Sequence, residues 1–287
     1  MTDLTAIVVG IDGSSASSAA IRFAAHEAKR LGSGIHLVHV VPNYEPVTPM
    51  FPLAPPDLVD TGREILAGAE EQAHALLAPG QVTTSLLNGP RVATLVEEAK
   101  QARLVVLGAE RRPAIDRLLT GSTVYGVAAH AACSVIAVPP EWSADVEHPA
   151  IVIGVKSAED SADVVRHAFD VASDRKADLV LLHAWELPNE YDDLIAARVH
   201  EDEWAERTRA AIEPIIHGLQ ETHPEVSVEV RVVHGQPARV LREASAEAEL
   251  LLIARRSHGF PFGYIGGTGR ALLREALCPV EVVPPAS

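Results

Sequence analysis

The chain has 287 residues, a formal charge of −15 and 47% hydrophobic residues, and only 4% of its residues are aromatic. The negative charge opposes non-specific attraction to nucleic acid, because such binding depends on Lys and Arg that neutralise phosphates. Few aromatic side chains are present on which bases could stack. No apolar run approaches the roughly 20 residues that span a bilayer, and the first residues lack a basic region followed by an apolar core. We therefore expect a soluble, cytoplasmic protein with no nucleic-acid or membrane partner.

The cysteine and histidine residues point to no metal centre. Cys133 and Cys278 are far apart in the chain, and neither has a second cysteine at metal-ligand spacing. Free thiols are expected in a reducing cytosol, although one disulfide between the two is conceivable. His36 and His39 are three residues apart in a strand-like run, so their side chains should lie on opposite faces and cannot share a metal.

The first half of the chain alternates short apolar strands with helices. Its opening run, AIVVGI, is continuously apolar, which is typical of a strand buried on both faces of a parallel sheet. Ser14 or Ser15 can cap the helix that follows, and Gly32 marks its end. The expected elements are, in order, strand 6–11, helix 16–31, strand 35–41, helix 58–78, strand 81–87, a helix begun by Pro90 and running to 102, strand 104–108, a helix opening at Ser122 and strand 134–138.

A proline-rich loop, residues 42–57, interrupts this pattern after the second strand. Two interpretations stay open for it. The loop could lie near a bound nucleoside, or it could be a plain surface insertion.

The pattern of the first half occurs a second time. Four blocks recur in the same order at offsets of 144 to 146 residues. The matching blocks are AIVVGIDGSSAS (6–17) with AIVIGVKSAEDS (150–161), IHLVHVVP (35–42) with LVLLHAWE (179–186), GPRVATLVEEAKQARLVVLG (89–108) with GQPARVLREASAEAELLLIA (235–254), and ACSVIAVPP (132–140) with LCPVEVVPP (277–285). The chain is therefore predicted to hold two copies of a unit of about 140 residues, joined near 141–150.

Five strands separated by four helices predict an α/β fold in each copy, with a doubly wound parallel sheet. Ligands of such folds sit beyond the carboxyl ends of the strands, where the strand order reverses. If the first and fourth strands are neighbours there, Asp12, Gly108, Gly121 and Ser122 converge, and the helix opening at Ser122 presents its free amides to an anion. The alternative is that Asp12 merely caps a turn and Ser122 merely caps a helix.

Known nucleotide-binding and hydrolase motifs are missing from the sequence. Neither GxxxxGK[ST] nor a GxGxxG that follows a strand is present, and no GxSxG marks a hydrolase nucleophile. His130 lies eight residues along the helix from Ser122, about 12 Å at the helical rise, so it cannot activate that hydroxyl. The sequence therefore offers no catalytic residues.

The sequence resembles the universal stress protein family in its tandem two-domain form. The resemblance rests on the VVGIDGS start, the LVHV second strand, the GP before the third helix, and Gly108-xx-Arg111-x9-Gly121-Ser122. It covers essentially the whole chain and implies two domains of the adenine-nucleotide-binding type, residues 1–142 and 149–287. It also implies a pseudo-two-fold axis between them through their last strands, SVIAV and PVEVV.

The resemblance also implies which residues hold a nucleotide in the first domain. Asp12 matches the family's acidic position and Val40, after His39, its nucleoside contact; Gly108, Gly121 and Ser122 match the phosphate motif, which Thr123 continues. Arg111 replaces the second glycine of the motif. Its side chain could block close approach of the backbone to phosphate, or it could clamp phosphate oxygens.

The second domain departs from the family pattern throughout. The loop is also one residue shorter, with eight residues instead of nine before Gly266. We expect this domain to bind no nucleotide and to act as a packing partner that covers strand edges. The replacements are Lys156 for the acidic residue, Ala184 for the valine, Ala254 and Ser257 for the first and second glycines of the phosphate motif, and Gly267 for the serine.

The resemblance leads to one functional expectation and one alternative. The first is a stress-response protein whose first domain binds ATP with Mg²⁺ and which senses or regulates rather than catalyses. The alternative is a nucleotide-free scaffold or interaction module in which both sites have decayed. Slow ATP hydrolysis lacks a positioned base. A homodimer and an unidentified regulatory protein partner are compatible with either.

Overall fold

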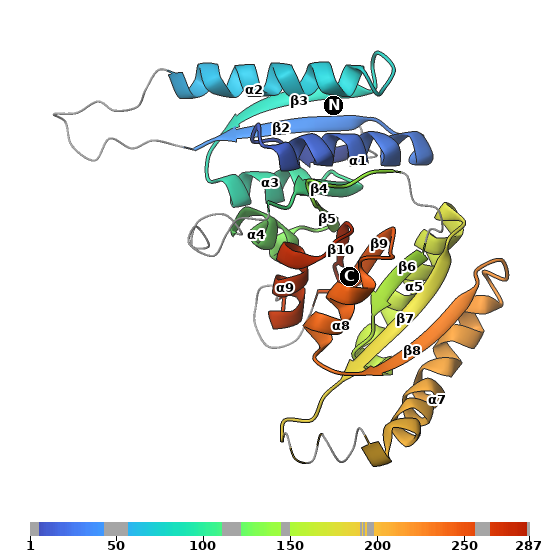
Figure 1. The fold of residues 1–287 in the computed structure, drawn as a ribbon. Helices are drawn as coiled ribbons and strands as arrows, with labels where there is room; N and C mark the ends of the chain where they lie inside the picture. Colours follow the sequence, from blue (N-terminus) through green and yellow to red (C-terminus); the bar gives the residue numbers. More distant parts are fainter. Residues whose placement is uncertain are drawn as a thin grey trace. The chain divides into compact units, whose positions relative to one another are not determined.

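The computed structural model describes residues 6–42, 57–110, 122–144, 150–189, 191, 193, 198–255 and 265–285 (Figure 1). The contacts divide the chain into two compact units, Met1–Ala144 and Asp145–Ser287. Each unit is an α/β domain, as the sequence predicts, and each is described in turn.

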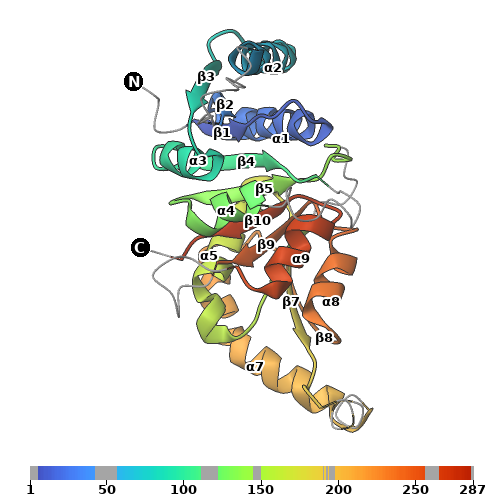
Figure 2. The ribbon, with the colours of Figure 1, turned by 90° about the vertical axis from the view of Figure 1, so that its left-hand side faces the viewer.

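The first unit contains a parallel five-stranded sheet with the strand order β3-β2-β1-β4-β5. Helices α1 and α2 cover one face, and α3 and α4 cover the other (Figures 1 and 2). The elements are β1 (Ile7–Gly10), α1 (Ser15–Leu31), β2 (Ile35–Val41), α2 (Asp57–His74), β3 (Val82–Asn88), α3 (Arg91–Ala99), β4 (Leu104–Gly108), α4 (Ser122–His130) and β5 (Ser134–Val138).

The second unit repeats this topology with the order β8-β7-β6-β9-β10, again with parallel pairing throughout. Helices α5 and α7 contact each other on one face, and α8 and α9 contact each other on the opposite face (Figure 2). The elements are β6 (Ala150–Gly154), α5 (Ala158–Arg175), β7 (Asp178–Trp185), α7 (Glu201–Gln220), β8 (Val228–His234), α8 (Pro237–Ala244), β9 (Leu250–Ala254), α9 (Gly267–Glu275) and β10 (Val280–Val283).

The central strands owe their formation to apolar side chains on both faces. Helices cover both sides of the sheet, so β-branched and leucine side chains are removed from water whichever way they point. The inner face of α1 is rich in alanine, which lets the helix axis approach the sheet closely. The fully buried strand residues include Ile7, Val9, Leu37, Val105 and Val106 in the first unit, and Ile151, Ile153, Leu179, Leu181 and Leu250 in the second.

Two helices of the first unit are shorter than the sequence predicts. We expected the helix 58–78 to be longer than α2, which ends at His74, and the helix reaching 102 to be longer than α3, which ends at Ala99. After α3, the amides of Lys100, Gln101 and Ala102 bond to carbonyls three residues back. The chain thus continues in tight 3₁₀-like turns, which a pattern of apolar residues does not distinguish from an α-helix.

Both histidines of β2 have the opposite orientations that the sequence predicts. His36 Nδ1 lies 2.7 Å from Thr83 Oγ1 on β3, whereas His39 Nδ1 lies 2.7 Å from the Ile11 carbonyl oxygen. Burial lowers the pKa of His36, although the charge of Glu98 opposes this. His36 is therefore a neutral packing residue at physiological pH.

The first helix of each unit ends in the same left-handed turn, but with different residues. Gly32 has φ 62° in the first unit, and Lys176 has φ 55° in the second. A side chain costs about 1–2 kcal/mol in this conformation, whereas glycine pays mainly in the entropy of the unfolded chain. A Cβ at Gly32 would meet no atom within 4 Å. The difference in cost between glycine and lysine in this turn therefore comes from the backbone conformation and not from a steric clash.

We expect Lys176→Gly to raise the free energy of unfolding of the second unit by roughly 0.5–1 kcal/mol. The reciprocal change, Gly32→Lys, should lower that of the first unit by about 1 kcal/mol. Urea unfolding followed by circular dichroism measures both. Equal stability of Lys176→Gly and the unmodified chain would show that the turn is not strained.

Candidate functional site

Strands β1 and β4 are neighbours at the point where the strand order reverses, as the convergence of the predicted residues requires. Gly10 pairs with Leu107 in parallel register, so the chain leaves both strands at the same edge of the sheet. Asp12 follows β1, and Gly108 ends β4. Loops at this edge of an open α/β sheet form the ligand-binding crevice.

Asp12 organises the turn that leads into α1. Its Oδ1 accepts a hydrogen bond from the Ser14 amide at 3.0 Å, and Gly13 takes the left-handed φ of 80° that the turn needs. Ser14 then caps the helix, with its Oγ accepting from the Ser17 amide at 3.1 Å. Asp12 is exposed, and its second carboxylate oxygen has no hydrogen bond to the described part of the protein. Asp12 is thus a turn-forming residue that still has an oxygen to offer a ligand.

Gly108 is required by the packing of β4 against α1. A Cβ added there would lie 2.4 Å from the Ala16 carbonyl carbon and 2.7 Å from the Ser17 amide nitrogen. Both are backbone atoms, so no side-chain rotation could relieve the overlap. The sequence suggested that this glycine serves close approach to phosphate; the structure gives it a reason that does not depend on a ligand.

Val40 can offer a ligand its backbone rather than its side chain. The residue as a whole, backbone included, is only 5% exposed. Pairing between β1 and β2 ends at Gly10 with Val38, and the Ile11 amide donates to the Val38 carbonyl oxygen at 2.9 Å. Backbone groups of alternate strand residues point the same way. The amide and carbonyl of Val40 therefore point toward the β1 side of β2. They lie beyond Val38, the last residue of β2 that pairs with β1.

His39 supports this edge from the neighbouring position. The ring donates its Nδ1 hydrogen to the Ile11 carbonyl oxygen, which can only accept. His183 on β7 makes the same contact with the Val155 carbonyl oxygen at 3.0 Å. The repeated histidine in LVHV and LLHA was the sequence signal for this support, and its structural role could not be read from spacing.

The remaining predicted residues belong to the loop after β4 and to α4. Arg111 and Gly121 lie outside the described residues, as does the proline-rich segment after Pro42 up to residue 56. Ser122 is the first residue of α4 and Thr123, which is half-buried, is the second. No acidic residue stands in the first turn of α4. The positive end of the α4 dipole is thus not neutralised by its own side chains.

The second unit differs at the same edge through its charges. Lys156, which replaces Asp12, pairs with Asp160 on α5 through an Nζ to Oδ2 distance of 2.6 Å. Glu159 and Asp160 both occupy the first turn of α5, whereas the first turn of α1 has no acidic residue. The α9 helix begins at Gly267 after a glycine cap with no side-chain hydrogen bond. Acids at a helix N-terminus oppose binding of phosphate.

Aromatic side chains cover the carboxyl ends of β7 and β8 in the second unit. Trp185 follows Ala184 at the end of β7 and stacks on Trp204 of α7, with ring centroids 5.4 Å apart and planes 14° apart. The ring of His234, the last residue of β8, packs against Trp185 in a T-shaped arrangement, with ring centroids 4.6 Å apart. In the first unit Val41 stands at the position of Trp185, against Gly62 of α2.

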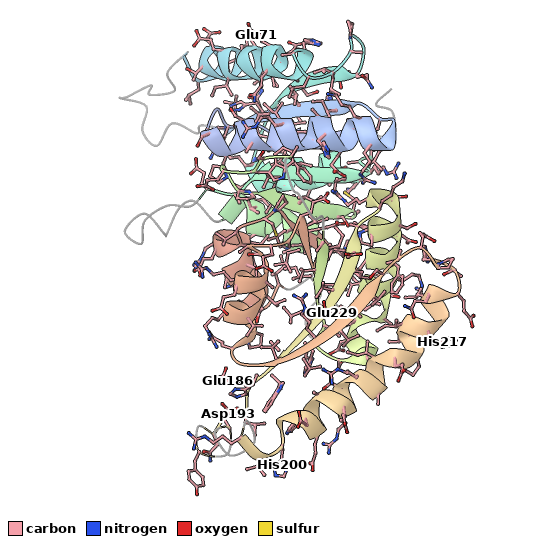
Figure 3. All side chains as sticks on the ribbon, turned by 45° about the vertical axis from the view of Figure 1, so that its right-hand side comes forward. Glu71, Glu186, Asp193, His200, His217 and Glu229 are labelled. Carbon is pink, nitrogen blue, oxygen red and sulfur yellow. The ribbon has the colours of Figure 1, made fainter. Side chains whose placement is uncertain are left out.

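Asp193 fixes the backbone that follows β7 to the end of β8 (Figure 3). Its Oδ1 accepts from the Leu187 amide at 2.7 Å, and its Oδ2 lies 2.9 Å from His234 Nε2. The Leu187 hydrogen bond, together with that from His234, lowers the pKa of Asp193. Protein side chains therefore occupy the space at the carboxyl ends of β7 and β8 in the second unit.

The two cysteines are free thiols, as expected. Cys278 is buried, and its burial raises the pKa of the thiol to about 12. Such a thiol is unreactive at neutral pH. Among the described residues, no helix is long and apolar enough to cross a membrane.

Comparison with known proteins identifies the family. The model of the universal stress protein family matches the chain twice, at residues 4–139 and 149–284. The chain belongs to the universal stress protein family. Each match covers one copy of the internal repeat, and the family places the chain among stress-response proteins, which are generally not classical enzymes.

Curated relatives share the tandem organisation along their whole length. A universal stress protein of Mycolicibacterium smegmatis is 32% identical over 97% of both chains. One from Mycobacterium tuberculosis is 33% identical over 96% of this chain and 95% of its own. Among solved structures, a universal stress protein from Archaeoglobus fulgidus covers 100% of both chains with a TM-score of 0.69 at 16% identity. This last likeness supports the fold.

Proposed function

We propose that the first unit of this universal stress protein binds ATP together with Mg²⁺ and that the chain acts as a sensor or regulator rather than as a fast enzyme. The observation that carries the proposal is the β1–β4 edge, where the exposed Asp12 carboxylate and the backbone of Val40 follow neighbouring strands. Helix α4, whose first turn has no acidic residue, comes after the loop that leaves β4 at this edge. These three features match the ribose, the base and the phosphates of a nucleotide. The family assignment supports the choice of an adenine nucleotide.

Each part of the nucleotide has a proposed partner in the chain. The second carboxylate oxygen of Asp12 would accept from a ribose hydroxyl. The amide and carbonyl of Val40 would bond the edge of the base. The phosphates would lie against the loop from Gly108 to Gly121 and the first amides of α4, with Ser122 and Thr123 supplying hydroxyls. Mg²⁺ would neutralise part of the phosphate charge, since it prefers phosphate and water oxygens.

The asymmetry between the units supports a single site per chain. In the second unit Lys156 is paired with Asp160, the first turn of α5 is acidic, and Trp185 with Trp204 covers the end of β7. These features disfavour phosphate and occupy space beside the nucleoside position. We propose that this unit binds no nucleotide.

The position of His130 speaks against activation of the Ser122 hydroxyl for catalysis. His130 ends α4, and its Nδ1 lies 2.7 Å from the Gly126 carbonyl oxygen of the same helix. It stands eight residues from Ser122, too far along the helix to take a proton from that hydroxyl.

A nucleotide-free interaction module is the second candidate, and one observation favours it. The packing of β4 on α1 explains Gly108 without any ligand. The glycine could therefore persist in a unit that had lost nucleotide binding. Mass spectrometry of small molecules released from purified protein decides between the candidates. An adenine nucleotide near one equivalent per chain supports the first, and its absence after incubation with ATP and Mg²⁺ supports the second.

Arg111→Gly tests how the Arg111 side chain contributes to ATP binding. If Arg111 clamps phosphate, we expect the dissociation constant for ATP to rise about tenfold or more, because a hydrogen bond to a charged group contributes about 1.5–3 kcal/mol. Arg111→Lys should recover part of the loss. Calorimetric titration measures both. Tighter binding by Arg111→Gly would instead show that the arginine blocks the site.

A further inference from the structure

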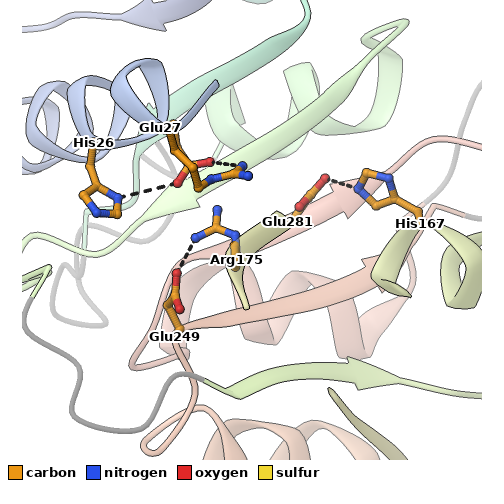
Figure 4. Close-up of polar contacts among 7 residues, drawn as sticks. His26, Glu27, His167, Arg175, Glu249 and Glu281 are labelled. Atoms are coloured by element: carbon orange, nitrogen blue, oxygen red, sulfur yellow. Dashed lines mark hydrogen bonds and ion pairs between the residues drawn. The ribbon is translucent and has the colours of Figure 1, made fainter. Parts of the chain in front are cut away.

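Two carboxylates and two imidazoles connect α5, β10 and the turn after α7 in the second unit. Glu281 Oε1 on β10 lies 2.6 Å from His167 Nε2 on α5, as Figure 4 shows. Asp170 follows His167 by one helical turn, and its Oδ1 lies 3.2 Å from Nε2 of His223. The proposed nucleotide site uses none of these residues.

The pair of Glu281 and His167 is unequal in burial. The Glu281 side chain is 5% exposed, whereas that of His167 is 35% exposed. An ionised carboxylate in the interior needs a cation or several hydrogen bonds, because it has lost its hydration. The imidazole provides the cation and can still exchange its proton with water.

The first unit has an apolar pair at the same positions. In the aligned repeats, Ile136 of β5 stands where Glu281 stands in β10, and Phe23 of α1 stands where His167 stands in α5. Both apolar side chains are 1% exposed. The fold thus does not require an ion pair between its first helix and its last strand. The second unit carries a titratable contact where an uncharged one suffices.

We propose that Glu281 and His167 form a pH-sensitive clamp that holds β10 against α5 while the imidazole carries its proton and loosens when the imidazole loses it. The charged groups that face His167 are Glu281 from β10 and Asp170 from its own helix, and His223 faces Asp170 from the turn after α7. The ion pair between Arg175, the last residue of α5, and Glu249, directly before β9, is made by other residues (Figure 4).

The direction of the pH dependence follows from the environment of His167. Burial of the ring disfavours its charge, but the hydrogen bond and charge of Glu281 and the charge of Asp170 outweigh burial and raise the pKa of His167. A raised pKa in the folded state means that the stabilisation is complete below the ordinary histidine pKa. It is lost as the pH rises through the higher folded value. Above that value Glu281 faces a neutral ring.

Hydrogen exchange of the β10 amides tests the clamp. Protection factors, corrected for intrinsic exchange, should fall roughly fivefold between pH 6 and pH 8.5 in the intact chain, because the charge-assisted hydrogen bond becomes an ordinary one. The double variant H167F/E281I installs the apolar pair of the first unit and should remove the pH dependence. His167→Lys keeps a cation throughout this range, so it should keep β10 protected at pH 8.5.

His217→Gln is the matched control. His217 makes a pair with Glu221 on the exposed face of α7, with side chains 76% and 71% exposed (Figure 3). This variant should leave the protection of β10 and its pH dependence unchanged. Protection in the intact chain that does not change with pH, or a pH dependence that persists in H167F/E281I, would overturn the proposal. Nucleotide binding plays no part in either result.

Discussion

The double variant D12A/S122A is expected to lose measurable ATP binding. Asp12 follows β1 with a carboxylate of which only Oδ1 is hydrogen-bonded within the described part of the chain, and Ser122 opens α4, whose first turn has no acidic residue. Each lost hydrogen bond to a charged group should weaken binding about tenfold or more. Together the two changes should raise a micromolar dissociation constant about a hundredfold or more, to roughly 0.1 mM or beyond, as read by calorimetric titration with ATP and Mg²⁺.

Two control variants separate ligand contacts from effects on the fold. Asp12→Asn keeps an oxygen that can accept from the Ser14 amide, so the turn should persist while the contribution of the charge is lost. Lys156→Ala changes the matching position of the second unit and should leave ATP binding unchanged. Binding by D12A/S122A equal to that of the intact chain would show that the ligand, if any, lies elsewhere.

Gly108→Ala is expected to destabilise the first unit by about 2–3 kcal/mol. The added methyl group would overlap the backbone of Ala16 and Ser17, so β4 or the start of α1 must move. Urea unfolding should show an earlier transition for the first unit. Because the chain has two units, the two transitions should be followed separately, for instance by hydrogen exchange of the amides of each sheet.

The second unit provides the control for this substitution. Ala254 stands at the end of β9 in the place of Gly108, so this unit already accommodates a methyl group there. Ala254→Gly should cost less than about 1 kcal/mol, which is the usual penalty of glycine in a strand. A loss in Gly108→Ala no larger than this would contradict the packing explanation of the glycine.

The strands were predictable because their signal is local. Continuous apolar runs such as LVVLG and LLLIA need no knowledge of their partners, and β4 and β9 begin and end at or within one residue of those runs. Helix ends were harder to place. The residues after Ala99 form three-residue turns in which side chains keep a nearly helical spacing, so the end of α3 left no mark in the sequence.

Contacts between distant residues could not be predicted. The backbone that excludes a side chain at Gly108 belongs to Ala16, and the carboxylate that faces His167 is 114 residues away in the chain. The sequence predicted that Asp12 and Gly108 share one edge if the first and fourth strands are neighbours, and the pairing of β1 with β4 meets that condition. Whether Arg111 clamps or blocks phosphate, and the two-fold relation of the units, stay predictions.

The stoichiometry of ATP binding tests the central claim most directly. Calorimetric titration of the intact chain with ATP and Mg²⁺, after removal of co-purified nucleotide, should give one site per chain with a micromolar dissociation constant. The same single site should remain in Lys156→Ala. Two sites would contradict the account of the second unit, and no detectable binding would contradict the nucleotide site at the β1–β4 edge.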